Sequence, residues 1–294
     1  MADPLHILVL GATGRLGRAM TRRYSVNGLS VKALSHAEMN LEHPEQLREE
    51  LARHEFNVLI NTAGLTDVDY CEAHPELSQT VNAEAPGVLA ECCAERGARM
   101  VQISTDYVFS GDQPGLLDEE APTGPINVYG RTKLEGERRV LAVLPSALVL
   151  RVSWLFGLEK PSFPDRIIRQ AMERLDVSAI DDKWSSPTYA DDLCDWTLAL
   201  LNRPEARGVF HLANRGDCSW TEYGNESLAI ASRLGLPVKA TSVRGHTMDG
   251  FARFLAARPR YTSLDTTRFT KTTGITPRRW ERALEEYLRL RHAH

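Results

Sequence analysis

The chain has 294 residues, of which 43% are apolar and 25% charged, and its formal net charge is −4. This length and balance are typical of a globular protein with one large or two small domains and a sizeable core. The slightly acidic charge argues against a nucleic-acid or anionic-membrane partner, and no stretch reaches the ~18 apolar residues that a membrane span needs.

The first half of the chain alternates short apolar runs with amphipathic stretches. Strands are predicted over residues 7–10, 30–34, 58–60, 100–103 and 147–152. Helices are predicted between them over residues 15–24, 44–54, 75–95 and 129–144. This alternation indicates βαβ units, and near-continuous apolar strands fit a parallel sheet that helices cover on both faces. The predicted fold is therefore α/β, a Rossmann-like doubly wound parallel sheet.

The pattern loosens after residue 152, where prolines and tryptophans punctuate the chain. Helices are predicted there over residues 165–175, 191–201, 221–234 and 277–290. No stretch has the composition of a flexible linker. We therefore expect the second part to pack directly against the first, with a cleft between them.

A glycine motif, with Gly11, Gly14 and Gly17, follows the first predicted strand and precedes the first predicted helix. Glycines at this spacing allow a tight turn and a close approach of backbone amides to a pyrophosphate, which the helix N-terminus then stabilises. A glycine triplet alone is weak, but the motif requires this strand–turn–helix context. The alternative is a glycine-rich turn that binds no ligand.

The end of the second strand bears on the choice of coenzyme. A coenzyme with a free ribose 2′-hydroxyl usually meets an acidic residue about 20 residues after the glycine loop. Here the strand ends at Leu34 and Ser35, and no acidic residue follows before Glu38, whereas Arg15 and Arg18 lie close to the loop. This favours a 2′-phosphate and hence NADPH as the coenzyme, with NADH as the alternative.

Tyr129 and Lys133 form a YxxxK pair at the start of a predicted helix. A separation of four residues places both side chains on one helical face. A nearby ammonium favours the phenolate and lowers the tyrosine pKa toward working pH, so that the tyrosine can exchange a proton with a carbonyl or alcohol oxygen. The alternative is a solvated helix face without a catalytic role.

Ser104 and Thr105 follow the fourth predicted strand directly. Ligands of a doubly wound sheet bind beyond the carboxyl ends of the strands, so both hydroxyls are expected to face the same site as Tyr129. The alternative is that these residues only cap a helix or form a turn.

We expect a cytoplasmic protein without a metal site. The N-terminal residues lack the basic region, the long apolar region and the cleavage site of a signal peptide. The nine histidines are scattered without metal-ligand spacing. The five cysteines form no CxxC pair and are expected to be reduced: Cys71, Cys92, Cys93, Cys194 and Cys218.

These motifs together resemble the extended short-chain dehydrogenase/reductases, and more closely the dTDP-4-dehydrorhamnose reductases. The resemblance is carried by the glycine loop, by the segments at 61–64, 104–111 and 129–137, and by further segments nearly to the C-terminus. It implies an oxidoreductase that uses NADPH or NADH to reduce the 4-keto group of a nucleotide-linked deoxysugar. The favoured reaction converts dTDP-4-dehydro-L-rhamnose to dTDP-L-rhamnose.

The resemblance also implies roles for individual residues. Tyr129 would donate the proton to the sugar C4 oxygen, Thr105 would hydrogen-bond that oxygen, and Lys133 would hold the nicotinamide ribose. Besides Tyr129 and Lys133, the implied coenzyme contacts are Gly11, Thr13, Gly14, Arg15, Leu16, Gly17, Ser35, Asn61, Ala63, Gly64 and Ser104. The implied substrate contacts are Thr66, Val68, Thr105, Tyr107, Tyr129, Trp154 and Arg258. Residues 1–155 are then expected to form the NAD(P)-binding Rossmann domain, to which some later segments return, and residues 156–294 mainly a smaller α/β substrate-binding part.

The chain departs from the family pattern on the substrate side. Lys183 stands where relatives commonly have Gln, Ser185 where they have Gly, and Ser162 where an Asn is expected. Some relatives dimerise through a magnesium ion held by a carboxylate just after the third glycine, and that position is Ala19 here. We therefore expect neither that metal nor that dimer, but a monomer or weak homodimer whose partner is a nucleotide sugar.

Two other functions are compatible with the same motifs. One is an NADP-binding regulatory subunit that resembles the beta subunit of methionine adenosyltransferase. The other is a nucleotide-sugar epimerase, in which hydride is removed and returned within one turnover. The complete set of Thr105, Tyr129 and Lys133, together with Trp154, favours the reductase, because a regulatory subunit has no physical need for these groups.

Overall fold

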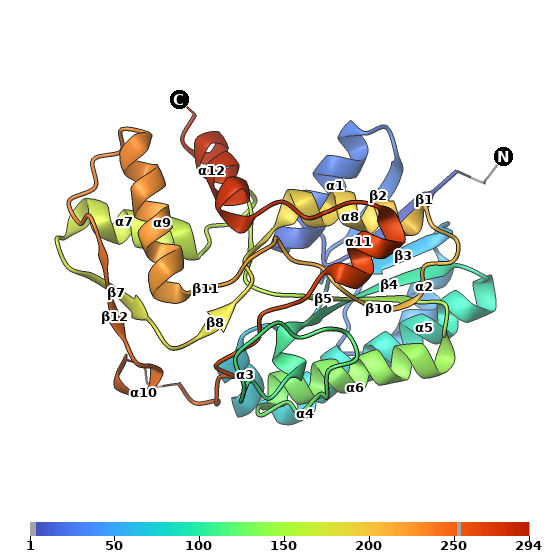
Figure 1. Cartoon of the computed structure of the whole chain (residues 1–294). Helices are drawn as coiled ribbons and strands as arrows, with labels where there is room; N and C mark the ends of the chain where they lie inside the picture. Colours follow the sequence, from blue (N-terminus) through green and yellow to red (C-terminus); the bar gives the residue numbers. More distant parts are fainter. Residues whose placement is uncertain (1–3, 252–253, 294) are drawn as a thin grey trace.

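The computed structural model, which describes residues 4–251 and 254–293, is built around a six-stranded parallel sheet (Figure 1). The strand order is β2-β1-β3-β4-β5-β10, so the chain reverses its direction of winding between β1 and β3. The predicted doubly wound parallel sheet is confirmed. The strands are β1 (His6–Leu10), β2 (Ser30–Leu34), β3 (Val58–Asn61), β4 (Arg99–Thr105), β5 (Leu148–Val152) and β10 (Gly208–His211).

Helices cover both faces of this sheet (Figure 1). α1 (Arg15–Val26) and α8 (Ala190–Leu201) pack on one face. α2 (Leu47–Ala52), α5 (Ala85–Arg96) and α6 (Val128–Val143) pack on the other. The near-continuous apolar strands of the sequence therefore reflect burial on both sides.

Strand alternation divides the core into two layers. In β1, Ile7 and Val9 point into the core beneath α1 and α8, whereas Leu8 and Leu10 point into the core beneath α2 and α5. All four side chains are at most 2% exposed. Successive strand side chains point to opposite faces, so one short apolar run anchors both helical layers.

The predicted helix over 75–95 contains a local irregularity. It consists of α4 (Pro75–Gln79), a π-helical turn (Thr80–Glu84) and α5, and it is preceded by the short helix α3 (Val68–Ala73). Gly136 of α6 packs closely against this turn. A Cβ at this position would lie 2.2 Å from the carbonyl oxygen of Asn82, so the contact requires glycine. π-Turns occur frequently at functional sites, and this one presents Asn82 to the loop after β3.

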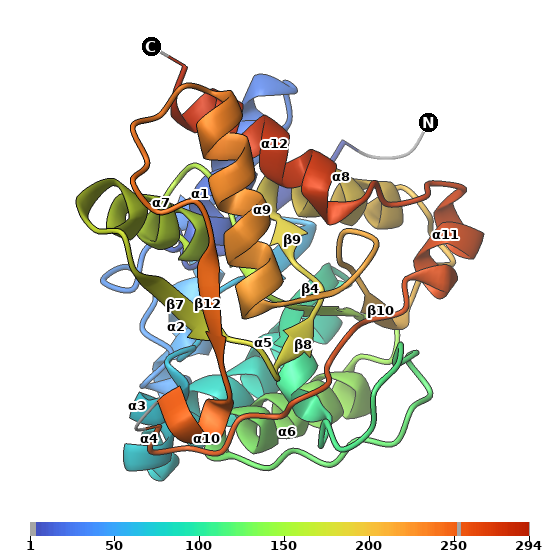
Figure 2. The ribbon, with the colours of Figure 1, turned by 60° about the vertical axis from the view of Figure 1, so that its left-hand side comes forward.

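The second half of the chain forms a smaller α/β part. Its centre is a parallel pair, β7 (Val177–Ile180) with β12 (Val243–His246), against which α9 (Trp220–Arg233) packs, with α7 (Phe163–Glu173) on α9 (Figure 2). The other elements of this half are β6 (Leu155–Phe156), β8 (Trp184–Ser185), β9 (Thr188–Tyr189), β11 (Cys218–Ser219), α10 (Met248–Phe251), α11 (Thr267–Thr273) and α12 (Trp280–Arg291).

Two segments of the second half return to the large sheet. β10 pairs in parallel with β5, and α8 packs beside α1. β10 was not among the predicted strands, because it has four residues, begins at Gly208 and ends at a histidine, which is a weak strand signal.

Within the described residues, no helix is long and apolar enough to cross a membrane. The five cysteines carry free, buried thiols.

Candidate active site

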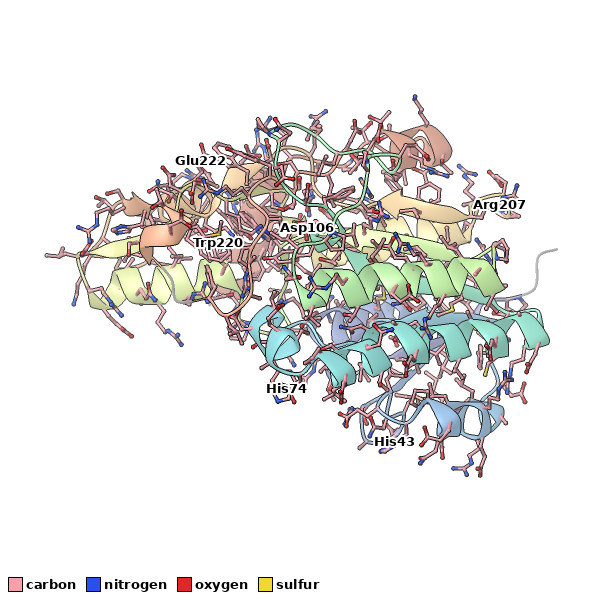
Figure 3. The ribbon with its side chains drawn as sticks, turned by 90° about the horizontal axis from the view of Figure 1, so that it is seen from below. His43, His74, Asp106, Arg207, Trp220 and Glu222 are labelled. Atoms are coloured by element: carbon pink, nitrogen blue, oxygen red, sulfur yellow. The ribbon has the colours of Figure 1, made fainter. Side chains whose placement is uncertain are left out.

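A cleft of about 620 Å³ opens where the carboxyl ends of the sheet strands face the smaller part. Its walls come from the loops after β1, β2, β3, β4 and β5 and from the start of α6. Figure 3 places Asp106, which follows β4, between the two parts, with Trp220 on the side of the smaller part. A doubly wound sheet binds its ligands at this edge.

The glycine loop forms a tight turn between β1 and α1. Gly11 has a φ of 86°, a left-handed conformation that favours glycine, and its amide donates to the carbonyl of Leu34 at 3.0 Å. A Cβ on Gly17 would lie 2.2 Å from the Gly11 carbonyl oxygen, so only glycine lets α1 approach the loop this closely. Gly14 caps α1 without a side-chain hydrogen bond, which leaves the first helical amides available for an anion.

Substitution of Gly17 by alanine is therefore expected to weaken binding of the coenzyme that the sequence predicts, NADPH, about tenfold or more, because overpacking of this kind costs about 1–3 kcal/mol. The matched control is Gly28→Ala, where φ is +73° but no atom lies within 4 Å of the added Cβ. That control should lose about 1 kcal/mol of stability and bind NADPH as the wild type does. Fluorescence titration measures both dissociation constants, and equal constants would contradict this account of the loop.

The YxxxK pair lies at the head of α6. Asn127 caps this helix by accepting a hydrogen bond from the amide of Gly130 at 2.8 Å, which fixes where Tyr129 enters the cleft. Lys133, one turn further, donates from Nζ to the carbonyl oxygen of Ile103 at 2.6 Å. The Tyr129 ring meets the edge of Tyr107, with ring centroids 5.6 Å apart. Both members of the pair line the cleft, as the spacing predicts.

Burial controls the protonation of both groups. It raises the pKa of Tyr129 above its usual range, and a hydrogen bond with Thr105 opposes this rise. Burial also lowers the pKa of Lys133 to about 8, and the charge of Glu137 opposes that fall. The expected lowering of the Tyr129 pKa is thus absent, because desolvation of the buried phenol has the larger effect. At neutral pH Tyr129 is a neutral phenol, the form that a proton donor needs, and Lys133 is mainly an ammonium.

The carboxylate of Asp106 accepts hydrogen bonds from hydroxyl groups of four segments of the chain. Its Oδ1 accepts from Thr105 at 3.1 Å. Its Oδ2 accepts from Ser153 at 3.0 Å, from Ser185 at 2.9 Å and from Thr262 at 2.6 Å. Because the hydroxyl proton of Thr105 is directed to Asp106, its oxygen is left to accept, and it accepts from the amide of Tyr107 at 3.2 Å. Asp106 therefore fixes the orientation of Thr105 and joins both parts of the molecule.

A second buried carboxylate lies beneath the cleft. Glu137, one turn beyond Lys133 on α6, binds Arg151 at 2.7 Å, and the two side chains are 3% and 5% exposed. Glu137 also accepts a hydrogen bond from the hydroxyl of Ser104, and Arg151 approaches Nε2 of His211 at 3.5 Å. Burial and the charge of Arg151 lower the pKa of His211 to about 3, so this imidazole is neutral. The network orients Ser104 and joins α6 to β4, β5 and β10.

Aromatic side chains form the wall of the smaller part. Trp154, which lines the cleft, has a φ of 39°. Among the described non-glycine residues, it is the one with a positive φ. Strain of this kind costs of order 1–3 kcal/mol and collects at functional sites. The indole stacks on Tyr223 at 6.0 Å and meets the edge of Trp220 at 5.8 Å. A smaller pocket of about 140 Å³ adjoins the cleft here, and Trp154, Phe163, Trp220, Tyr223 and Arg166 are among its walls.

The structure brings most of the predicted site residues together in the cleft. Its lining includes Gly11, Thr13, Gly14, Arg15, Leu16, Ala63, Gly64, Thr66, Val68, Ser104, Thr105, Tyr107, Tyr129, Lys133 and Trp154.

Four predicted site residues lie outside this lining. Gly17 packs against the loop behind it. Ser35 donates to Glu38 at 2.7 Å, and the buried Asn61 donates to Gln102 at 2.9 Å. Arg258 forms an ion pair with Asp69 at 3.0 Å. Asn61 still supports the cleft, because it accepts a hydrogen bond from the amide of Ala63 at 3.1 Å.

Several residues of the lining were not predicted as site residues. They include Asp106 and Ser153, and side chains of the loop after β2: His36, Met39, Asn40, Leu41 and Glu42. Asp106 had a signal, because it directly follows Thr105 at the end of an apolar strand. The loop after β2 had a positional signal, because the end of this strand lies where a coenzyme ribose is usually bound, but its composition did not single out the residues beyond Ser35.

The two arginines near the glycine loop differ in their surroundings. Arg15 lines the cleft, but its guanidinium donates to the carbonyls of Leu155 at 2.9 Å and Pro161 at 2.8 Å. Arg18 is exposed and lies outside the lining. Across residues 4–251 and 254–293, His, Cys, Asp and Glu side chains form no group of three that could hold a metal ion.

Known proteins resemble this chain over nearly its whole length. Residues 5–292 match the family model described as the RmlD substrate binding domain. The chain is 38% identical to dTDP-4-dehydrorhamnose reductase of Streptomyces griseus, with 95% of this chain and 91% of that protein covered. It is 36% identical to a probable dTDP-4,6-dihydroxy-2-methyloxan-3-one 4-ketoreductase of Streptomyces antibioticus, with 95% and 93% covered. The crystal structure of dTDP-4-dehydrorhamnose reductase from Bacillus anthracis in complex with NADP has a TM-score of 0.90 at 28% identity, with 97% and 99% covered.

Proposed function

Because the chain belongs to the RmlD substrate binding domain family, that of the NAD(P)H-dependent dTDP-4-keto sugar reductases, we propose that it reduces dTDP-4-dehydro-L-rhamnose to dTDP-L-rhamnose. The observation that carries this proposal is one cleft that holds both the glycine loop and the set Thr105, Tyr129 and Lys133. One relative is named as a probable 4-ketoreductase of a different dTDP-linked sugar. The identity of the sugar is therefore what the experiment must test.

The residues around the glycine loop fit a nicotinamide dinucleotide. The loop leaves no room for a Cβ at Gly11 or Gly17, and the first amides of α1 have no side-chain cap. A pyrophosphate placed there would be held by backbone amides and the helix N-terminus. When bound, the coenzyme supplies a hydride.

Tyr129 supplies the proton in the proposed reaction. Its neutral phenol points into the cleft, so it transfers its proton to the sugar C4 oxygen as negative charge develops there. Thr105 is the second proposed contact to that oxygen, and to donate to it the hydroxyl must turn away from Asp106. Lys133 keeps its ammonium at neutral pH and would bind the nicotinamide ribose. Thr66, Val68, Tyr107 and Trp154 remain the proposed sugar contacts.

We assign the smaller aromatic pocket to the nucleotide of the substrate. Trp220 offers aromatic surface for a planar base, and Phe163, which stacks on Tyr223 at 5.3 Å, supports this wall of the pocket. Arg166, whose pKa is lowered by burial, lies over the Phe163 ring at 5.4 Å and presents a cation to a phosphate. Residues 1–155, with β10 and α8, would then bind the coenzyme, and most of residues 156–294 the nucleotide sugar.

NADPH is the coenzyme that we propose, with NADH as the weaker one. The end of β2 carries Ser35 instead of an acidic residue, and the carboxylate of Glu38 is engaged by Ser35 through the backbone amide at 2.8 Å and the hydroxyl at 2.7 Å. The position that usually binds a ribose 2′-hydroxyl is thus not occupied by a free acid. Neither nearby arginine is poised at a 2′-phosphate, so the preference should be modest.

The test of the proposed function is oxidation of NADPH and of NADH by the purified protein, given enzymatically made dTDP-4-dehydro-L-rhamnose. We expect turnover with both coenzymes and a higher kcat/KM with NADPH. Tight NADPH binding without turnover of this sugar would overturn the proposed substrate, and dTDP-4-keto-6-deoxy-D-glucose is the next to try. Failure to bind either coenzyme would overturn the assignment of the glycine loop.

A further inference from the structure

Lys183 is a lysine without solvent exposure, in the turn between β7 and β8. Its Nζ donates to the carbonyl oxygen of Pro259 at 2.7 Å. The carboxylate of Asp106 is the negative charge that acts on it, while Arg258 opposes its positive charge. Lysine is almost never fully buried unless it is paired, because desolvation of the ammonium is costly. We therefore expect the buried ammonium of Lys183 to serve a function.

The ammonium of Lys183 faces an aromatic ring of the cleft. Its Nζ lies 4.9 Å from the ring centroid of Tyr107. The same ring lines the cleft and meets the edge of Tyr129 at 5.6 Å. The ring face attracts an ammonium more strongly when the ammonium is shielded from water, so this contact holds the ring in place.

Lys183 also ties this ring to the segment 254–260. Besides the bond from Lys183 to Pro259, the amide of Trp184 donates to the carbonyl of Arg260 at 2.7 Å. The same segment bonds to α3, because Arg258 pairs with Asp69 at 3.0 Å. Lys183 therefore connects Tyr107 of the cleft wall to the segment 254–260, which runs from the smaller part back to α3.

We propose that Lys183 is a positioning residue for the sugar end of the cleft, where its ammonium holds the ring of Tyr107 against Tyr129. The inference rests on the proposed function, since it concerns the binding of the sugar nucleotide at that site. Lys183 does not line the cleft itself, so its effect on the substrate passes through Tyr107. The expected signature is a change in KM for the sugar nucleotide that leaves the coenzyme end unaffected.

The contact is expected to depend on pH. Burial lowers the pKa of Lys183 to about 8, with Arg258 adding to the fall and Asp106 opposing it. Below this pH the ammonium is present, and above it the neutral amine no longer attracts the Tyr107 ring. The charged and titratable groups that face it are Asp106, Tyr107 and Arg258. Since Lys133 also titrates near pH 8, but at the coenzyme end, the KM for the sugar nucleotide and the KM for NADPH must be measured separately.

The experiment compares wild type with Lys183→Gln, which keeps a donor for Pro259 without the charge, and Lys183→Met, which removes both. The matched control is Lys271→Gln at an exposed position of α11. We expect both Lys183 variants to raise KM for the sugar nucleotide on the order of tenfold at pH 7, with kcat and KM for NADPH within about twofold. In the wild type this KM rises as the pH passes 8, whereas in both variants it stays flat.

Removal of the Lys183 ammonium leaves the buried carboxylate of Asp106 without that charge, so Lys183→Met is expected to lose stability. Lys183→Gln keeps a hydrogen-bond donor and is expected to lose less, so the test rests on this variant. Thermal unfolding of each variant checks this expectation. A wild-type KM for the sugar nucleotide that is flat from pH 7 to 9, or a Lys183→Gln variant with wild-type KM at pH 7, overturns the proposal. Absence of wild-type turnover would instead refute the proposed function.

Discussion

Replacement of Tyr129 by phenylalanine is expected to lower turnover of the keto sugar by roughly 10²- to 10⁴-fold, with a much smaller effect on NADPH binding. The substitution removes one oxygen atom and keeps the ring that packs against Tyr107. The lost group is the neutral phenol that would protonate the sugar C4 oxygen. Without it the developing alkoxide meets Thr105 alone. Loss of NADPH absorbance in the steady state gives kcat and KM, and fluorescence titration gives the coenzyme dissociation constant.

Two further measurements distinguish loss of the proton donor from a general loss of structure in the Tyr129→Phe variant. The fall should appear in kcat and should persist at saturating sugar nucleotide, because the phenol acts on the transition state. The melting temperature should change little, since the phenol is one buried hydroxyl among many in this region. A Tyr129→Phe variant that keeps more than about a tenth of wild-type kcat would mean that another group donates the proton.

Separation of the buried pair Glu137 and Arg151 is expected to cause the largest loss of stability. Arg151→Met leaves the carboxylate of Glu137 in a site where it is 3% exposed, with Ser104 as its remaining donor. Removal of one partner from a buried ion pair costs about 3–5 kcal/mol, because the other charge stays desolvated and uncompensated. Urea unfolding should therefore show a lower midpoint with an unchanged slope.

The matched control is the double variant Glu137→Leu with Arg151→Met. It removes both charges and fills the space with apolar side chains, so most of the lost stability should return. The unfolding free energies of the wild type, Glu137→Leu, Arg151→Met and the double variant together give the interaction energy between the two side chains. If Arg151→Met alone unfolds at the wild-type urea concentration, the network is not a source of stability. The double variant should also bind NADPH more weakly, because Ser104 loses the carboxylate that orients it.

The sequence was most informative where one local signal decides the structure. The predicted strands of the first half all occur in the sheet: β1, β3 and β5 are apolar runs buried on both faces, whereas the edge strand β2 is only partly buried. The head of α6 was predictable from the YxxxK spacing, since a four-residue separation has one geometric meaning on a helix.

Structure set by distant contacts could not be predicted in this way. β7 and β12 are four-residue strands that exist because they pair with each other and pack on α9. The ion pair of Arg258 with Asp69, far away in sequence, could not be predicted either, and the expected contact of Arg258 with the substrate stays a prediction. The raised pKa of Tyr129 depends on how deeply the phenol is buried, and burial depends on the whole fold.

The pairing of β10 with β5 has a consequence for how the chain is made. The outer edge of β5 stays open until residues 208–211 have left the ribosome, so at least 211 of the 294 residues must be synthesised before the sheet can close. During that interval a nascent strand of five buried residues offers unpaired amides and carbonyls to any neighbouring chain. Fragments that stop short of residue 208 should therefore aggregate during expression, and chains that extend beyond α8 and β10 should be the first to yield folded sheet.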